Sequence, residues 1–345
     1  FATSLVLSCG LPKVLQESSF GDFLAKIGDY SYSIYLVHFP IIVLYLYEPF
    51  SGTILYPENY VDKAILLGLI IVTSVLMHRY VETRRINSAS KVYATSLVSM
   101  LLLVGATKIA PSIIYNQNDQ NIFAGLNDRA VYRCGKIVRI TNPTAISCKI
   151  NEESFDRSIL LVGNSHADSI KQAFVEVAST HKMNTYFMVS NTPLMDNSVT
   201  VKALINEAVK LNIKNIVLHY SPKSLKVETL EEVLKLADQK DIKVDLILPV
   251  PVYEDSIPKL LYLDQLKGMN EQKYLAKNAE YFAQINVLKN QYQIFKAYDV
   301  HTVLCQPDCA IKSTDNKPYY FDSNHLTLTG AQQLKPVFER IFLIR

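Results

Sequence analysis

The stretch SILLVGNSHADSI, residues 158–170, contains the transition on which the fold of this chain depends. Residues 158–163 form an apolar run of strand type, and an amphipathic pattern typical of a helix follows directly after Asn164. Ser165 therefore lies at the tip of a buried strand and at the start of a helix. A serine in that position either caps the helix or acts as a nucleophile, which needs a base from elsewhere in the chain.

The same alternation of patterns continues to the C-terminus. Strands are predicted at 158–163, 185–190, 215–220 and 244–250, with a weaker one near 292–295 or 300–305. Helices are predicted at 167–180, 200–211, 227–240, 270–290 and 328–341. Such alternation is typical of a mainly parallel sheet with helices on both faces, so we expect a three-layer α/β domain over residues 158–345.

Residues 1–110 have a different composition, with many aliphatic and aromatic residues and few charges. The segments 30–47, 64–78 and 92–107 are apolar enough to span a bilayer, and residues 1–9 resemble the end of a fourth span. Because the chain does not start with methionine, we expect it to be the C-terminal part of a longer protein. Residues 111–157 are polar without clear periodicity and are predicted to form a linker and a loop-rich entry segment that Cys134 and Cys148 could pin.

The charges of the loops predict the orientation of these spans. The loop at 78–91 carries four basic residues, whereas the loop at 48–63 carries three acidic residues and one lysine. The positive-inside rule places the basic loop in the cytoplasm. The third span then delivers everything after residue 110 to the outer side of the membrane.

Five cysteines and a small net charge restrict the partners further. Cys9 lies in the apolar N-terminal run and is predicted to be a free thiol, while the other four form two local pairs, Cys134 with Cys148 and Cys305 with Cys309. Such pairs suit disulfides in an oxidising compartment, and four free thiols in the cytosol are the alternative. Because no CxxC or nearby histidine has zinc-ligand spacing, no metal site is expected. A net charge of +3 gives no case for nucleic-acid binding.

A base for Ser165 is available near the C-terminus, in YYFDSNHLTLTGAQQL at 319–334. Asp322 and His325 stand three positions apart, so the carboxylate can orient the imidazole while the imidazole takes the proton of Ser165. The neighbouring His166 is a poor base, because adjacent residues at a helix start point in different directions. Taken singly, a strand-tip serine also suits a helix cap, and an Asp-x-x-His pair also suits a surface pair.

Together, Gly163-Asn164-Ser165-His166 and Asp322-Ser323-Asn324-His325-Leu326 resemble the first and last sequence blocks of the SGNH hydrolase superfamily, in the same order. The resemblance implies a flavodoxin-like fold with Ser165 as nucleophile, His325 as general base and acid, and Asp322 as its orienting partner. Asn164 replaces the aspartate that is usual in the first block. The blocks that supply the other oxyanion donors have no clear match, so the Ser165 N–H is the expected donor, with Asn191 or the backbone near Ser221 as further candidates.

The membrane part resembles the last helices of the acyltransferase family 3 proteins. Two stretches show this resemblance: IGDYSYSIYLVHFPIIV, which contains His38, and HRYVETRRI, which contains Glu82. His38 and Glu82 are therefore candidate functional residues of the membrane part. Simpler interpretations are that His38 packs inside the helix bundle and that Glu82 closes a helix end with Arg84 or Arg85.

Family members with one extra span and an exported SGNH domain O-acylate bacterial surface glycans such as lipopolysaccharide O-antigen. The resemblance thus implies an O-acyltransferase of the bacterial inner membrane, with its SGNH domain on the periplasmic side. The expected acyl donor to the membrane part is acetyl-CoA or another acyl-CoA, with no bound cofactor, and the expected acceptor is a surface or lipid-linked glycan. The alternatives are an esterase that deacylates surface glycan and a non-catalytic glycan-binding domain.

Overall fold

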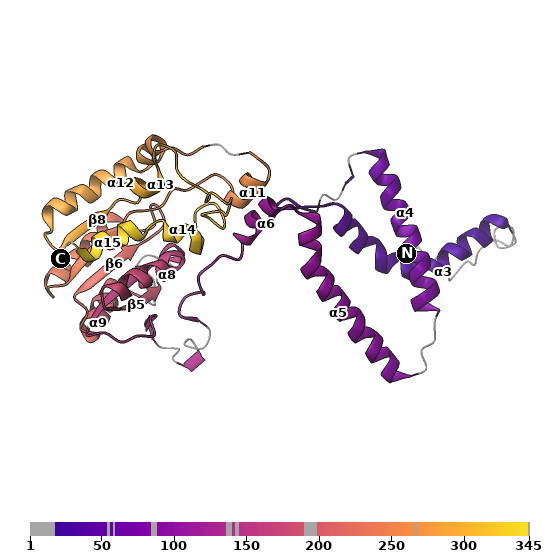
Figure 1. Cartoon of the computed structure of the whole chain (residues 1–345), viewed down its shortest axis with the longest axis horizontal. Helices are drawn as coiled ribbons and strands as arrows, with labels where there is room; N and C mark the ends of the chain where they lie inside the picture. The colour runs from indigo at the N-terminus through magenta and orange to yellow at the C-terminus, as the bar shows by residue number, and fades with distance from the viewer. Residues whose placement is uncertain are drawn as a thin grey trace, which may run out of the picture. The chain divides into compact units, whose positions relative to one another are not determined.

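The structure of the chain is a computed structural model that describes residues 18–343 except 54–55, 58, 84–87, 136–139, 142–144, 190–198 and 266–267 (Figure 1). Cys9, Arg84, Arg85, Asn191 and the span expected at residues 1–9 lie outside the described residues. The chain divides into two compact units, Phe1–Lys108 and Ile109–Arg345.

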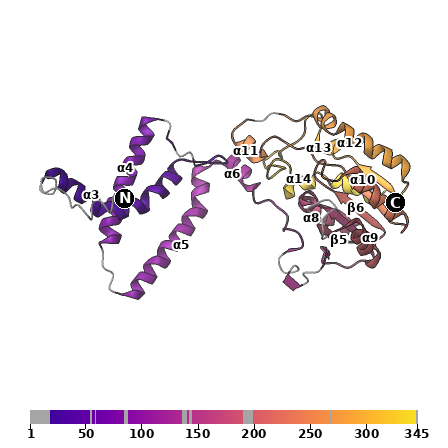
Figure 2. The same ribbon diagram turned by 180° about the vertical axis from the view of Figure 1, so that it is seen from behind.

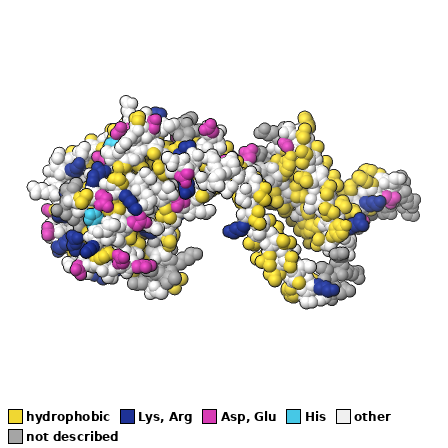
Figure 3. Space-filling model, viewed as in Figure 1, with side chains coloured by type: hydrophobic (Ala, Val, Ile, Leu, Met, Phe, Trp, Pro, Cys, Tyr) yellow, Lys and Arg dark blue, Asp and Glu magenta, His cyan; other side chains and the backbone are white. Residues whose placement is uncertain are grey.

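The first unit consists of long apolar helices. Helix α3 covers Ser19–Tyr45, α4 covers Tyr60–Met77 and continues as the π-helix η1 at His78–Glu82, and α5 covers Ala89–Ile114. A small hairpin of β1, Tyr47–Glu48, and β2, Gly52–Thr53, follows α3. All three helical segments are long and apolar enough to cross a membrane. Apolar side chains cover the visible face of these helices (Figure 3), as expected for surfaces that face lipid.

The second unit starts with the short helix α6, Gln117–Ala124, and contains a six-stranded sheet in the order β3-β5-β4-β6-β7-β8. The strands are β3 Ser147–Lys149, β4 Arg157–Gly163, β5 Met183–Val189, β6 Asn215–His219, β7 Lys243–Ile247 and β8 Phe295–Tyr298. Strands β4 to β8 pair in parallel, and β3 pairs antiparallel with β5 at one edge. The predicted mainly parallel sheet is thus confirmed.

Two details of the sheet differ from the sequence-based expectation. The last parallel strand lies at 295–298, whereas the run at 300–305 contains the short helix α13, His301–Leu304, instead of a strand. The edge strand β3 lies in the segment that was predicted to be a linker. Three residues are too few to produce a readable alternation, and the pairing of β3 with β5 decides its conformation.

Helices cover both faces of the sheet (Figures 1 and 2). On one face, α8 (Ser165–Thr180), α14 (Leu328–Gln332) and α15 (Lys335–Leu343) bury residues such as Phe174 and Phe338 against the inner strands. On the other face, α9 (Val201–Lys210), α10 (Val227–Asp238) and part of α12 (Glu271–Gln291) form a second core with Leu204 and Val233. A short helix α11, Ile257–Tyr262, lies in the β7–α12 connection. The helix predicted at 328–341 is thus divided into α14 and α15.

The end of β4 is packed tightly against its neighbour β6. A Cβ atom at Gly163 would lie 1.8 Å from the His219 carbonyl oxygen and 2.6 Å from the Ala167 Cβ, so glycine is needed at this position. Asn164 then caps α8 with its side chain. In parallel sheets, ligands bind at the carboxyl ends of the strands, which is the edge where this turn presents Ser165.

Candidate active site

Ser165 is the first residue of α8, directly after the tip of β4, and its side chain is exposed. The first backbone N–H groups of a helix have no partner within the helix and carry the positive end of its dipole. Ser165 is therefore reachable by a substrate and lies where developing negative charge is stabilised.

The structure brings the C-terminal histidine to this serine. His325 Nε2 lies 2.7 Å from Ser165 Oγ, although the two residues are 160 positions apart in the chain. On the other side of the ring, His325 Nδ1 lies 2.7 Å from Asp322 Oδ2. With Nδ1 protonated and donating to the carboxylate, Nε2 is free to accept the hydroxyl proton of Ser165. The three predicted residues thus form one continuous hydrogen-bonded relay.

Asp322 is held in place by the backbone as well as by the imidazole. Its Oδ1 accepts hydrogen bonds from the N–H groups of Asn324 at 2.9 Å and His325 at 2.8 Å. Burial raises the pKa of the carboxyl, but the hydrogen bonds from His325 and from the two N–H groups lower it by more, so the pKa lies below its ordinary value. Asp322 is therefore a carboxylate over the pH range in which an imidazole acts as a base.

Two aromatic rings hold the plane of the His325 imidazole. Phe321 stacks on it with ring centroids 5.3 Å apart and an angle of 4° between the planes. His166 packs against it at 4.7 Å and 45°. His166 is 1 % exposed, and burial lowers its pKa well below the usual value, so it is a neutral ring. His166 therefore contacts the base rather than the serine, a role that its position next to Ser165 does not reveal.

Asn164 connects the tips of β4 and β6. Its Oδ1 accepts from the N–H groups of His166 at 3.1 Å and Ser221 at 3.3 Å, and its Nδ2 donates to Ser221 Oγ at 2.8 Å. The residue that departs from the superfamily pattern thus supports the turn that carries Ser165. The Ser221 N–H, a candidate oxyanion donor, donates to Asn164 and so supports the turn instead.

Of the other oxyanion donors expected from sequence, Asn191 lies outside the described residues. The first backbone hydrogen bond of α8 runs from the Asp168 N–H to the Asn164 carbonyl. Among the described backbone contacts, the Ser165 N–H has no acceptor. It remains the predicted donor for an oxyanion at this edge of the sheet.

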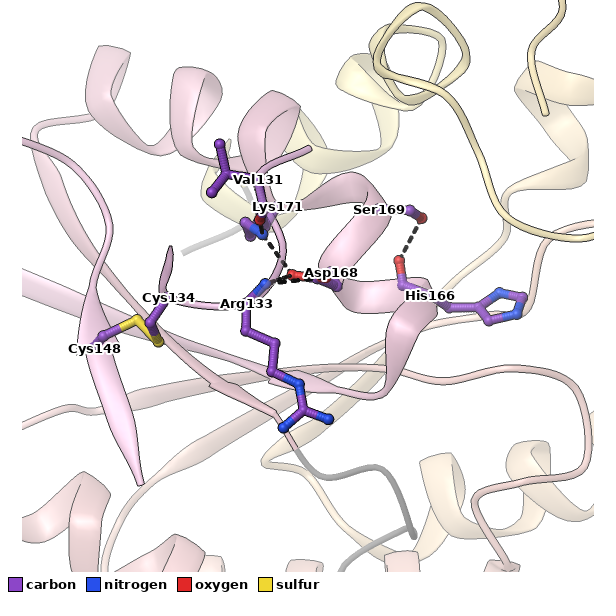
Figure 4. A network of polar contacts seen from close by, with 8 residues as sticks. All are labelled: Val131, Arg133, Cys134, Cys148, His166, Asp168, Ser169 and Lys171. Atoms are coloured by element: carbon purple, nitrogen blue, oxygen red, sulfur yellow. Dashed lines mark hydrogen bonds and ion pairs between the residues drawn. A yellow bond between two sulfur atoms is a disulfide. The ribbon is translucent and has the colours of Figure 1, made fainter. Parts of the chain in front are cut away.

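The four cysteines of this unit form two disulfides, Cys134–Cys148 and Cys305–Cys309. The first one ties the segment before β3 to β3 itself, near α8. In the first turns of α8, Asp168 accepts from the Arg133 N–H, and Lys171 binds both Asp168 and the Val131 carbonyl (Figure 4). Sequence reasoning did not single out these residues, because an Asp and a Lys in the first turns of a helix usually indicate a solvated helix face.

The membrane candidates lie in the first unit and are not brought together by the described contacts. His38 Nδ1 lies 3.0 Å from the Ile34 carbonyl of its own helix. Glu82 accepts from Ser33 Oγ at 2.6 Å and lies 3.1 Å from His78 Nδ1. Ser33 is on α3, so Glu82 links the π-helix to α3, and Arg84 and Arg85, the partners suggested by the sequence, lie outside the described residues.

Among the described residues, no group of three or more His, Cys, Asp or Glu side chains is arranged so that it could hold a metal ion.

Comparison with known proteins identifies the family. Among solved structures, the chain is similar to the periplasmic domain of the lipopolysaccharide acetyltransferase of Salmonella ser. Paratyphi A, with 16% identity, a TM-score of 0.47, and coverage of 67% of this chain and 98% of that chain. No curated protein matches the sequence significantly. A family model described as "SGNH domain (fused to AT3 domains)" matches residues 133–340, which is more than half of the chain. The resemblance seen in the sequence is thereby confirmed, and the chain belongs to this family of SGNH domains fused to AT3 domains.

Proposed function

We propose that this chain is part of a membrane-bound O-acyltransferase, in the first place an O-acetyltransferase, that modifies hydroxyl groups of a bacterial cell-surface glycan such as lipopolysaccharide O-antigen. The observation that carries the proposal is the continuous Ser165–His325–Asp322 relay in an SGNH domain of the kind that is fused to AT3 domains.

In the first half of the reaction, Ser165 Oγ attacks the carbonyl carbon of an acyl donor. His325 Nε2 takes the hydroxyl proton, and the ionised Asp322 stabilises the resulting imidazolium. The negative charge on the carbonyl oxygen is stabilised by the Ser165 N–H and the N-terminus of α8. The leaving group takes the proton from His325, and Ser165 is left as an acyl ester.

In the second half, a glycan hydroxyl replaces the leaving group. His325 Nε2 removes the proton of that hydroxyl, the sugar oxygen attacks the acyl ester, and Ser165 leaves with the proton returned by the imidazole. The products are the O-acylated glycan and the free serine.

The membrane part supplies the acyl group in this proposal. Its three spanning helices and the family's fusion to AT3 domains support a route in which acetyl-CoA, or another acyl-CoA, donates from the cytoplasmic side. The SGNH domain would then stand on the periplasmic side of the inner membrane, where its two disulfides are stable. The acceptor would be a surface glycan or its lipid-linked precursor.

The test is to trap the acyl-enzyme on the full chain. The protein in detergent is incubated with a small acyl ester, digested and analysed by mass spectrometry for an acyl group on the peptide that contains Ser165. Ser165→Ala should abolish the adduct, whereas Ser179→Ala, at the far end of the same helix, should leave it unchanged. An adduct that persists in Ser165→Ala, or glycan acylation in cells that Ser165→Ala does not reduce, would disprove the serine mechanism.

Hydrolysis is the second candidate function, because the exposed position of Ser165 also admits water to an acyl-enzyme. In that case the chain is an esterase that removes acyl groups from surface glycan. The release of acid from an acyl ester is measured with and without sugar acceptors. Transfer predicts that acceptors divert the acyl group to the sugar, whereas hydrolysis that no acceptor changes favours the esterase. A non-catalytic glycan-binding domain would give no adduct at all.

A further inference from the structure

The segment 128–134, which we term the strap, precedes β3 and contacts the elements that carry Ser165 and His325. At its first residue, the Asp128 carbonyl accepts from the Leu328 N–H at 2.9 Å, and Asp128 Oδ2 accepts from the Thr329 N–H at 3.0 Å. Leu328 and Thr329 begin α14, three and four residues after His325. This end of the strap is therefore fixed to the element that carries the base.

The other end of the strap is fixed to the helix that carries the nucleophile. The Arg133 N–H donates to both carboxylate oxygens of Asp168, at 3.0 and 3.2 Å, and Lys171 binds the Val131 carbonyl. Asp168 is three residues after Ser165 on α8, which makes the two side chains neighbours on the helix surface. Cys134 closes the strap through its disulfide to β3. Figure 4 shows this arrangement from close by.

The strap carries one arginine near each of its two ends, Arg129 and Arg133. Arg129 is exposed and lies over the Phe321 ring, 4.1 Å from its centroid, and Phe321 in turn stacks on His325. The Arg133 backbone is held one helical turn from Ser165, and its side chain points away from Lys171 (Figure 4). The Arg133 guanidinium lies over the Tyr132 ring, 4.9 Å from its centroid. The Arg133 Nε is buried and has no hydrogen-bond partner among the described residues. A buried donor without an acceptor is costly unless a ligand satisfies it.

The carboxylates near these arginines are engaged elsewhere. Asp168 pairs with Lys171 at 2.5 Å and accepts the Arg133 N–H, and Asp128 accepts from Thr329. Asp322 pairs with His325. Within the described part of the chain, neither guanidinium lies within ion-pair distance of a carboxylate, so the strap carries two positive charges without an acidic partner among the described residues. Such a pair attracts an anion, and a guanidinium binds carboxylate or phosphate through two parallel hydrogen bonds.

We propose that Arg129 and Arg133 form an anion-binding subsite beside the relay, which holds a carboxylate or phosphate group of the acceptor glycan. The acceptor would then be an acidic sugar chain or a phosphate-linked glycan rather than a neutral one. This role in acceptor choice rests on the proposed function, whereas the binding of an anion does not.

Binding is tested without catalysis on the full chain with Ser165→Ala, purified in detergent. The probes are inorganic phosphate, glucuronate and glucose, and the readout is a calorimetric titration. Phosphate or glucuronate should bind while glucose does not, and the additional double change Arg129→Ala and Arg133→Ala should weaken the binding about tenfold or more. Arg157→Ala is the matched control, because Arg157 begins β4 at the opposite end of the sheet.

Each outcome of this titration decides the proposal. Tighter binding of phosphate than of glucuronate identifies a phosphate-linked acceptor, and the reverse order identifies an acidic sugar. Equal weakening by Arg157→Ala and by the strap variants would show unspecific charge attraction and overturn the subsite. If the protein binds neither anion and binds only to vesicles that contain an anionic phospholipid, the subsite is overturned in favour of a membrane contact.

A kinetic experiment separates this proposal from the proposed function. The KM is measured for an acidic and for a neutral oligosaccharide acceptor. The alanine variants of Arg129 and Arg133 should raise the KM for the acidic acceptor, and the lysine variants Arg129→Lys and Arg133→Lys should raise it several-fold less. If the wild-type chain transfers acyl groups equally well to both acceptors and the alanine variants change neither KM, the subsite is wrong and the acyltransferase stands. If Ser165 never carries an acyl group, the proposed function is wrong, and the titration still decides the anion site.

Discussion

At the scale of single residues, the three histidines near the relay differ in what burial does to them. His325 is partly exposed and has a partner at each ring nitrogen. His166 and His219 are buried, and His166 Nδ1 and His219 Nε2 have no hydrogen-bond partner among the described residues. Burial disfavours their charged forms, so these two rings stay neutral beside the imidazole that must accept a proton.

The change Asp322→Asn tests the orienting carboxylate. The amide cannot stabilise an imidazolium at His325, so we expect acyl-enzyme formation to slow by roughly 10³–10⁴-fold while the fold is retained. The rate of adduct formation at Ser165 measures the effect. Asp315→Asn is the control, since Asp315 is a surface carboxylate that binds Ser313 and Lys317. A loss below about tenfold would show that Asp322 does not orient the base.

His219 makes the stability of the α/β unit depend on pH. Burial lowers its pKa from 6.5 to about 4, and the bond from Nδ1 to the Ile247 carbonyl at 3.1 Å opposes this shift. Between these pKa values, the unfolded chain binds a proton that the folded chain excludes. The free energy of unfolding should therefore be constant above about pH 6.5 and fall as the pH drops toward 4.

Thermal melts at pH 7.5, 6 and 5, followed by tyrosine fluorescence because the chain has no tryptophan, measure this dependence. His166 contributes in the same direction, since its pKa is also lowered. His219→Gln should make the fall with decreasing pH shallower. The same slope in His219→Gln and in the wild type would show that His219 is not the titrating group.

At the scale of elements, the turn from β4 to α8 depends on close contact between neighbouring strands. Gly163 permits β4 to approach the His219 carbonyl, and Asn164 then bonds to Ser221, two residues after the end of β6. Asn164 can accept from backbone N–H groups and donate to a hydroxyl at once, which an ionised aspartate cannot do. The asparagine in the first sequence block therefore suits the serine that this chain has at position 221.

Gly163→Ala should destabilise the unit by more than about 3 kcal/mol, because the new methyl group meets backbone that cannot move without separating β4 from β6. Gly268→Ala is the matched control, since no described residue beyond its chain neighbours lies within 4 Å of a Cβ at that position. The melting temperatures of both variants measure the difference. Equal melting temperatures would mean that the two strands separate easily at this edge.

At the scale of the whole molecule, the segment predicted to be a linker and loop-rich entry segment is part of the α/β unit. It supplies the edge strand β3, a disulfide and a strap that contacts the elements that carry Ser165 and His325. The compact second unit accordingly begins at Ile109, within α5. The family model starts at residue 133, inside the strap.

Removing the Cys134–Cys148 disulfide should loosen the strap. The bond closes a loop of 14 residues, for which chain entropy gives about 3 kcal/mol of stabilisation. The double change to serine should lower the melting temperature and weaken anion binding, because Arg133 is next to Cys134. The same double change at Cys305 and Cys309 should leave anion binding intact. Equal anion binding in both double variants would show that the disulfide does not hold Arg133.

The orientation of the chain in the membrane is tested by cysteine labelling. In a Cys9→Ser background, we expect a membrane-impermeant thiol reagent to label Lys277→Cys on α12 in intact spheroplasts. Ser90→Cys, at the start of α5, should be labelled only after lysis. Labelling of Ser90→Cys in intact spheroplasts would contradict the periplasmic location of the α/β unit.

The sequence by itself determined the strand–helix alternation, the apolar spans and the two blocks with Ser165, Asp322 and His325. These features are local, because periodicity, glycine placement and short motifs depend on residues within a few positions of one another. Tertiary structure alone decided the hydrogen-bond geometry between Ser165 and His325, 160 positions away, the packing of His166 on His325, and the contacts of the strap with α8 and with Phe321. Those contacts join residues far apart in the chain, and the packing of the sheet and its helices selects them.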